Sequence, residues 1–319
     1  MATGTKAIYY ALAANAGIAL TKTAAAVVTA STSMTAEAIH SFADCGNQVL
    51  LLFGMKRAKA PATDLHPLGY GKVSYFWSFL VALLLFSVGG LFSVYEGSHK
   101  LLKPEPLQYP WLAIAVLAVG VALESFSLYG ALKEVKSSRG QRSLYRWFRE
   151  TRQSELMVVI GEDIAALLGL VVALIFVSLA FVTGNPLFDA VGSIVIGILL
   201  IAIALMITLE IKSLIIGESA DEVFKNQLRS FFAERYPNTE VLNLITQHHG
   251  PDIILALKVQ FRRWPATARA LVDQVNTIEK AIRQQFPSVR FIFFEPDISS
   301  TEKQKQLTTR GKKKTRAKK

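Results

Sequence analysis

Residues 36–44 read AEAIHSFAD and place Glu37, His40 and Asp44 inside an apolar run, residues 34–55. The three polar residues are spaced three and then four apart, so they share one face of a helix. A charged group at the centre of a bilayer costs about 2.5–3.5 kcal/mol on insertion scales. A bound cation would offset that cost, because it is itself the partner that each polar group needs. The stretch therefore predicts a membrane helix that carries a cation site.

The apolar residues of the chain gather into long runs. The chain has 319 residues, of which 51% are hydrophobic, and a helix needs about 20 mostly apolar residues to cross roughly 30 Å of hydrocarbon. Six runs reach this length with few charges, which predicts an all-α bundle of six transmembrane helices. The first has no small-residue cleavage site before a soluble domain and is interpreted as a span. The runs are Tyr9–Thr29, Met34–Phe53, Phe76–Val94, Trp111–Leu132, Leu156–Val182 and Leu187–Ile216.

The net charge of +11 is distributed unevenly along the chain. Residues 133–152 hold seven Lys/Arg and residues 55–72 hold four, whereas the connections at 31–33 and 183–186 hold none. Basic connections on alternate sides follow the positive-inside rule and place both termini in the cytoplasm. We therefore expect a multi-pass integral membrane protein, with a bacterial inner membrane as the default, and no nucleic-acid partner. Cys45 is the single cysteine, so no intrachain disulfide is possible.

The pattern changes after residue 216. Two amphipathic helical segments and three short strand-like runs follow in the order helix, strand, strand, helix, strand, with Gly250-Pro251 at a predicted hairpin. We predict three parts: a six-span cation efflux domain over 7–216, a cytoplasmic α+β dimerisation domain over 217–298, and a basic, disordered tail over 299–319. The tail suits contact with anionic lipid headgroups.

The fifth apolar run supplies groups that match those of the second. It contains GEDIAALLGL, with Glu162 and Asp163 inside apolar sequence. If the second and fifth helices face each other, His40, Asp44 and Asp163 converge. One imidazole with two carboxylates suits a small divalent cation of the zinc type. The alternative of hydrogen-bonded structural groups between packed helices stays open, above all for Glu37 and Glu162.

Four segments of the sequence resemble the cation diffusion facilitator family of divalent-metal/proton exchangers. The segment AEAIHSFADCGNQVLLLFG resembles the second span of the family, and HPLGYGKVSYFWS resembles the start of its third span. The segment NPLFDAVGSIVIGILL resembles the sixth span, and HHGPDIILALKVQF the cytoplasmic hairpin. The match runs in order over about residues 7–298 and is most similar to the zinc-transporter-nine-like branch, which also has a Glu-Asp pair in span five.

The resemblance implies a ligand set and one departure from it. His40 and Asp44 correspond to the second-span pair of the family, in which a histidine accompanies zinc preference, and Asp163 to the fifth-span aspartate. The family histidine that precedes this aspartate by four residues is replaced by Val159, which cannot bind metal. Glu162, Glu37 or water is left to supply the fourth ligand. An oxygen-richer set makes manganese, iron and cobalt alternatives to zinc.

Further residues are candidates for supporting roles. In some relatives the loop between spans two and three holds a second metal site, for which this chain keeps Asp64 and His66 but has Tyr70 in place of a second histidine. The resemblance also pairs Lys72 with a carboxylate after span six, here Glu218.

Two charged residues lie deep in other spans. Lys22 is in the first run and Glu124 in the fourth. We expect them to form an ion pair, directly or within a network, because an isolated charge in the bilayer is costly.

The resemblance implies a homodimeric transporter that exports a divalent cation from the cytoplasm in exchange for protons. The metal ion, protons and the lipid bilayer are then its partners, and no catalytic cofactor or enzymatic activity is expected. One alternative is a metal-binding or scaffold membrane protein that lost transport with the histidine at position 159. Another is a membrane-embedded hydrolase, for which the sequence shows neither a lateral substrate cleft nor a clear water-activating base.

Overall fold

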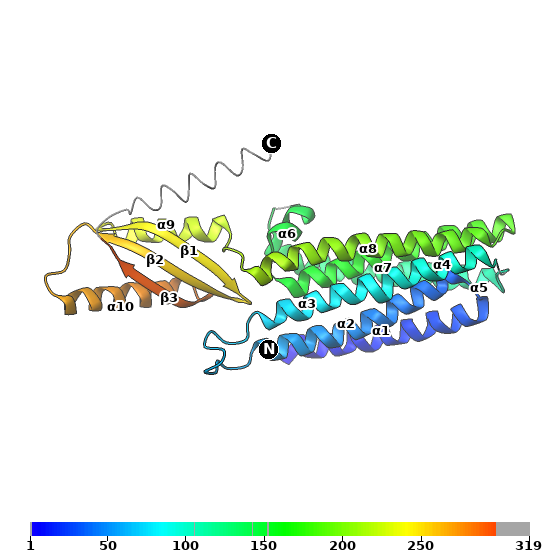
Figure 1. Cartoon of the computed structure of the whole chain (residues 1–319), viewed down its shortest axis with the longest axis horizontal. Helices are drawn as coiled ribbons and strands as arrows, with labels where there is room; N and C mark the ends of the chain where they lie inside the picture. The colour runs from blue at the N-terminus through cyan, green and yellow to red at the C-terminus, as the bar shows by residue number, and fades with distance from the viewer. Residues whose placement is uncertain (1, 105, 142, 152, 298–319) are drawn as a thin grey trace. The chain divides into compact units, whose positions relative to one another are not determined.

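The computed structural model describes residues 2–104, 106–141, 143–151 and 153–297, and it divides into two compact units between Ile216 and Gly217. The first unit is helical, and its long helices lie side by side (Figure 1). The predicted tail over 299–319 lies outside the described residues. The positions of the helices and strands are as follows: α1 Ala2–Thr29, α2 Thr32–Ala58, α3 Val73–Leu84, η1 Leu85–Leu91, α4 Phe92–Leu102, α5 Pro110–Arg139, α6 Leu144–Glu150, α7 Ser154–Thr183, α8 Leu187–Ile216, α9 Glu222–Arg235, β1 Thr239–His249, β2 Asp252–Phe261, α10 Ala268–Gln285 and β3 Val289–Pro296.

Four helices among the described residues are long and apolar enough to cross a membrane. They are the continuous helix Val73–Leu102, which joins α3, η1 and α4, and Pro110–Lys133, Ser154–Thr183 and Leu187–Ile216. Helices α1 and α2 have similar lengths but are not in this group. In α2 the apolar run is interrupted by the polar groups that predict the cation site, which lowers its mean hydropathy. The structure thus supports a mostly helical protein with four candidate membrane helices, fewer than the six predicted.

The third apolar run forms a helix with an irregular centre. Its middle turns, Leu85–Leu91, are π-helical, a feature that is rare and is frequent at functional sites. This helix packs closely on α8 through small residues: a Cβ atom on Gly97 would lie 2.7 Å from the Ala190 carbonyl oxygen, and one on Gly197 would lie 2.6 Å from Val94 Cγ2. The glycines of span six therefore permit close helix contact, as expected from the sequence.

Asp189 joins three parts of the first unit at one end of the bundle. Its carboxylate is fully buried and lies in the first turn of α8. It accepts hydrogen bonds from Ser31 Oγ at 2.7 Å, from Thr32 N at 2.7 Å and Oγ1 at 2.8 Å, and from Ser33 N at 3.2 Å. The Lys100 ammonium of α4 lies 3.2 Å away and completes the set. Because the backbone donors belong to the first turn of α2, Asp189 also interacts favourably with the dipole of that helix.

The turn between α1 and α2 is held in an unusual backbone conformation. Ala30 has φ 53°, in the left-handed region that residues with a Cβ atom seldom adopt. The Lys100 ammonium donates a 2.6 Å hydrogen bond to the Ala30 carbonyl oxygen, and Gln108 N donates to Thr29 O at 2.8 Å. These contacts stabilise the tight connection between the first two helices.

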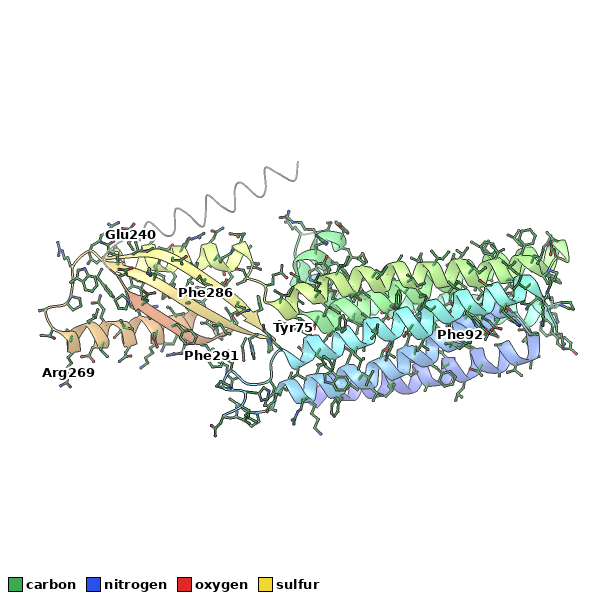
Figure 2. The ribbon with its side chains drawn as sticks, in the orientation of Figure 1. Tyr75, Phe92, Glu240, Arg269, Phe286 and Phe291 are labelled. Carbon is green, nitrogen blue, oxygen red and sulfur yellow. The ribbon has the colours of Figure 1, made fainter. Side chains whose placement is uncertain are left out.

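The second unit has the predicted order of helix, strand, strand, helix, strand. β1 pairs with β2 in antiparallel orientation, and β2 pairs with β3 in parallel orientation. Gly250, at φ 66°, forms the predicted hairpin turn. α9 and α10 bury one face of the sheet. There Phe286, labelled in Figure 2, packs against two other aromatic rings: its ring centroid lies 5.4 Å from that of Phe224 and 5.7 Å from that of Phe231.

Replacing Asp189 by alanine is expected to lower the free energy of unfolding by about 3–5 kcal/mol, because it leaves the buried Lys100 ammonium without its charge partner. Thermal unfolding of the full chain in detergent measures this change. The control Glu96→Gln alters a half-buried acid of α4 that has no role in this network and should unfold as the wild type does. An Asp189→Ala protein as stable as the control would contradict the role assigned to Asp189.

Candidate metal centre

His40 is buried on α2 and points to Asp44 one turn further along. The side chain of His40 is completely inaccessible to solvent, and its Nδ1 lies 3.5 Å from Asp44 Oδ1. Within the described part of the chain, neither ring nitrogen of His40 nor Asp44 Oδ1 has a hydrogen-bond partner. A Cβ atom on Gly89 of the π-helical segment would lie 3.9 Å from Nδ1. Buried polar atoms usually have partners, so these unsatisfied atoms mark a place for a ligand.

Glu37 shares this face of α2 but is neutralised by a lysine. Lys22 Nζ of α1 lies 3.3 Å from Glu37 Oε2 and donates a 2.8 Å hydrogen bond to Ser41 Oγ. The Lys22 and Glu37 side chains are 2% and 0% exposed, so the ion pair is shielded from solvent. The ion pair joins α1 to α2 and so fixes the two helices against each other. Glu37 is therefore held as a structural partner of Lys22.

The described residues show no direct ion pair between Lys22 and Glu124, because Lys22 reaches Glu37 and Ser41 of α2 instead. The networked form of the predicted pair stays a prediction. The partner of Lys22 could not be predicted from the sequence, because it depends on how α1 is rotated relative to α2 and α5.

Glu162 of α7 is also engaged. Asn47 Nδ2 of α2 donates a 2.5 Å hydrogen bond to Glu162 Oε1, and both residues are buried. Asn47 was not among the site residues predicted from the sequence. It lies three residues after Asp44, on the same helical face, so a polar residue at that spacing in an apolar run was the signal that would have found it.

A small cavity of about 20 Å³ lies between α1, α2, α5 and α7, large enough for roughly one water molecule. Asp44 and Asp163 both line it, and Val159, in the place of the family histidine, faces the same space. Its lining residues are Asn15, Ile18, Ser41, Asp44, Gln48, Glu124, Val159, Glu162, Asp163 and Ala166. His40 is not among them and reaches the cavity only through its contact with Asp44.

The carboxylates surround the cavity without converging on one point. Over the described ranges, no group of three or more His, Cys, Asp or Glu side chains lies close enough together to hold a metal ion. The arrangement provides several oxygen donors and one buried imidazole, a set that suits divalent cations of the first transition series.

The loop between α2 and α3 does not assemble the second site. Asp64 and His66 are exposed, and the His66 ring lies against that of Tyr70, with centroids 4.5 Å apart. The Thr63 and His66 backbones are paired in a short bridge. Tyr70 therefore supports the turn in the place of the second histidine, and Asp64 and His66 remain predicted ligands only.

Lys72 and Glu218 belong to different units. Lys72 Nζ donates to the Ile215 carbonyl oxygen at the end of α8, at 3.3 Å, whereas the Glu218 carbonyl oxygen accepts a hydrogen bond from His248 N within the second unit. The ion pair between Lys72 and Glu218 stays a prediction.

Acidic residues of the second unit are bound by a lysine. Lys258 Nζ lies 3.0 Å from Asp297 Oδ2 and 3.1 Å from Glu295 Oε1. The hydrogen bonds to Asp297 and Glu295 raise the pKa of Lys258. These two carboxylates are therefore partners of a lysine in the structure.

Comparison with known proteins gives one family-model match and several relatives. The model of the cation efflux transmembrane domain matches residues 8–215. The chain is 36% identical over 195 residues to the mitochondrial proton-coupled zinc antiporter SLC30A9 of Xenopus laevis, covering 60% of this chain and 35% of the relative. It is 34% identical over 176 residues to the Homo sapiens protein of the same name, covering 54% and 31%. It is 32% identical over 200 residues to metal tolerance protein C4 of Arabidopsis thaliana, covering 61% and 43%. The chain spans about a third of the length of the two vertebrate relatives.

The Lys22–Glu37 pair predicts a characteristic pattern of stabilities. Lys22→Met is expected to lower the free energy of unfolding by about 3–5 kcal/mol, because it leaves the Glu37 carboxylate buried and unpaired. The double variant Lys22→Met/Glu37→Gln removes both charges and should recover most of this loss. Thermal unfolding in detergent provides the measurement.

The control for this series is Lys133→Met at an exposed position of α5, with an expected change within about 0.5 kcal/mol. If the double variant is as unstable as Lys22→Met alone, the destabilisation has another origin than the unpaired carboxylate.

Proposed function

Because the chain belongs to the cation efflux family, we propose that it is a membrane transporter that exchanges a divalent cation, zinc or a similar ion, for protons and exports the cation from the cytoplasm. Membership confirms the resemblance to cation diffusion facilitators, and the antiporter relatives confirm a position near the zinc-transporter-nine-like branch. The vertebrate relatives are named antiporters, and none of the three relatives' names denotes a catalytic activity.

The cavity beside His40 is the observation that carries the proposal. Carboxylates from three helices, α2, α5 and α7, line one cavity, and the His40 imidazole, which has no hydrogen-bond partner among the described residues, contacts its wall at Asp44. In a membrane such groups are costly without counter-charges. A divalent cation in this cavity would supply two positive charges among the carboxylates, whereas a scaffold requires none.

The proposed membrane arrangement has six spans. It adds α1 and α2 to the four candidate membrane helices, because α2 packs against α1, α3, α7 and α8 and thus lies within the same bundle. The cation efflux domain then extends over 7–216, and the α+β unit over 217–298 is a cytoplasmic dimerisation domain. Both termini lie in the cytoplasm, as the basic connections indicate.

Proton exchange follows from competition for the same atoms. Carboxylates and imidazole bind metal only when they are deprotonated, so metal binding releases protons and protonation releases the metal. When the cavity opens to the cytoplasm, Asp44, Asp163 and His40 load the cation. When it opens to the far side, protons displace the cation. Repacking of the helix bundle between the two openings gives alternating access.

The donor set bears on which ion is carried. The vertebrate relatives are named zinc antiporters, and zinc is the proposed ion. Val159 lines the cavity where the family has a histidine, so the site has more oxygen and less nitrogen than a zinc site with two imidazoles. This composition favours manganese, iron and cobalt as further substrates.

The comparisons support an integral membrane protein and do not identify the membrane. The vertebrate relatives carry the word mitochondrial in their names, so the bacterial inner membrane, which rested on no residue of the sequence, has no support from them. The metal ion, protons and the lipid bilayer remain the proposed partners.

The alternative is a transport-deficient metal-binding or scaffold protein of the same fold. Two observations favour it: Val159 replaces a ligand, and the described side chains form no coordinating cluster. A single assay separates it from the transporter.

Purified protein in liposomes is expected to carry Zn²⁺ across the membrane and to drive protons in the opposite direction. A metal-sensitive dye and a pH-sensitive dye inside the liposomes measure the two fluxes, and Mn²⁺, Fe²⁺ and Co²⁺ complete the panel. Asp44→Ala should reduce both fluxes to the level of empty liposomes, because a cavity carboxylate is lost. Glu96→Gln is the matched control and should transport as the wild type does. Binding of metal without flux in the wild type would establish the scaffold instead.

The chain is also expected to be a homodimer. Light scattering on the full chain after size-exclusion chromatography in detergent should give twice the mass of one chain. A mass of one chain at all protein concentrations tested would overturn the proposed dimer and leave the transport proposal untouched.

A further inference from the structure

We propose that Glu124 of α5 is a ligand of the transported cation and takes the place of the histidine that Val159 replaces. The inference rests on the proposed transport function and identifies the group that completes its site. Ligands in the resemblance come from the second and fifth spans alone, whereas Glu124 belongs to the fourth.

Glu124 is free for this role because the expected lysine is engaged elsewhere. Lys22 donates to Glu37 and Ser41, and no hydrogen bond or ion pair joins Glu124 to another side chain in the described part of the chain. A carboxylate inside a membrane bundle requires a counter-charge. With Lys22 paired to Glu37, a cation in the cavity is the counter-charge that Glu124 can meet.

The position of Glu124 satisfies the geometric requirement. Its side chain lines the same cavity as Asp44 and Asp163, and α5, which carries it, packs against both α7 and α1. The cavity is small, about 20 Å³, which is room for roughly one water molecule. A cation in this space would face the carboxylates of α2, α5 and α7 that line it.

The other candidates for the fourth ligand have partners. Glu37 is paired with Lys22 through Oε2 and is not among the residues that line the cavity, although its Oε1 has no hydrogen-bond partner among the described residues. Glu162 accepts a hydrogen bond from Asn47. Val159 faces the cavity and has no donor atom. Glu124 is the cavity carboxylate outside the predicted set, and it lies across from the helix that lost its histidine.

A second observation, independent of the acidic cluster, indicates that the space receives a ligand. The His40 ring is fully buried, its two nitrogens are unpartnered across the described residues, and Nδ1 is directed at Asp44 on the cavity wall. A structural histidine in an apolar bundle would have at least one hydrogen bond. The imidazole and the carboxylates therefore form one set: His40, Asp44, Asp163 and Glu124.

The set has consequences for selectivity. Three carboxylates and one imidazole replace the two imidazoles and two carboxylates that suit tetrahedral zinc. Oxygen ligands favour Mn²⁺ relative to Zn²⁺ more than imidazole does. Glu124 is therefore a specificity-determining residue as well as a ligand.

Equilibrium binding of Zn²⁺ and Mn²⁺ chloride to the full chain in detergent, measured by calorimetry, tests the assignment without requiring transport. Glu124→Gln keeps the shape of the side chain and should raise the Kd of both ions about tenfold or more, at least as much as loss of a supporting group does in metal sites. Glu96→Gln, the same change in a spanning helix away from the cavity, should leave both Kd values unchanged. Thermal unfolding of each variant verifies that it is folded.

A rescue variant tests whether Glu124 binds the metal itself or only supports the other ligands. Glu124→Gln/Val159→His returns an imidazole to the cavity and should restore Zn²⁺ binding to near the wild-type Kd, while Mn²⁺ binding remains weak. If Glu124→Gln does not fold, Glu124→Asp keeps the carboxylate on a shorter side chain and should still raise the Kd of both ions severalfold.

The outcomes distinguish this inference from the proposed function. If the wild type transports metal and Glu124→Gln binds and transports it equally well, Glu124 is not a ligand, although the transport function stands. If the wild type binds neither ion, the transport proposal fails together with the ligand. Failure of the histidine to restore Zn²⁺ binding in the folded double variant would also overturn the assignment.

Discussion

The buried ion pair between Lys22 and Glu37 determines which carboxylates of the bundle are structural and which are available to an ion. In a medium of low dielectric constant each buried charge requires a partner at contact distance. One ammonium group satisfies one carboxylate in this way, and Lys22 is committed to α2. The acids that line the cavity are therefore the ones proposed to meet a cation, and Glu124 is one of them although the sequence suggested a structural role.

At the start of α2 another buried carboxylate, Asp189, also has a lysine as its partner, and there the pair stabilises the bundle. Asp189 receives the Lys100 ammonium, two hydroxyl groups and the backbone donors of Thr32 and Ser33, and is fully satisfied. Asp44 Oδ1, a few turns along the same helix, has no hydrogen-bond partner among the described residues. Asp189 is thus a fixed contact, whereas Asp44 has an oxygen without a hydrogen bond, although both lie inside the bundle.

Much of this arrangement could be predicted because its signals are local. The period of apolar residues located the long helices, and three short strand-like runs with a hairpin at Gly250-Pro251 located the sheet of the second unit. The spacing of His40 and Asp44 fixed their shared face. The partner of Lys22 could not be predicted, since it depends on the rotation of α1 relative to α2 and α5, which no local pattern encodes. The short helix α6, capped by Ser143 and anchored by the buried Trp147, was missed inside a basic connection, and the π-helical segment has no sequence signature that we used.

The polarity of α2 explains why the helix with the most site residues is not among the candidate membrane helices. Glu37, His40, Asp44 and Asn47 lower its hydropathy, and an isolated helix of this composition would enter lipid poorly. Within the bundle each of these side chains turns toward α1, α7 or the π-helical segment instead of lipid. Because α2 packs against α1, α3, α7 and α8, the neighbouring helices provide the apolar surface that it lacks. A binding helix of this kind is stable only as part of the bundle, so the ion site and the packing of the bundle depend on each other.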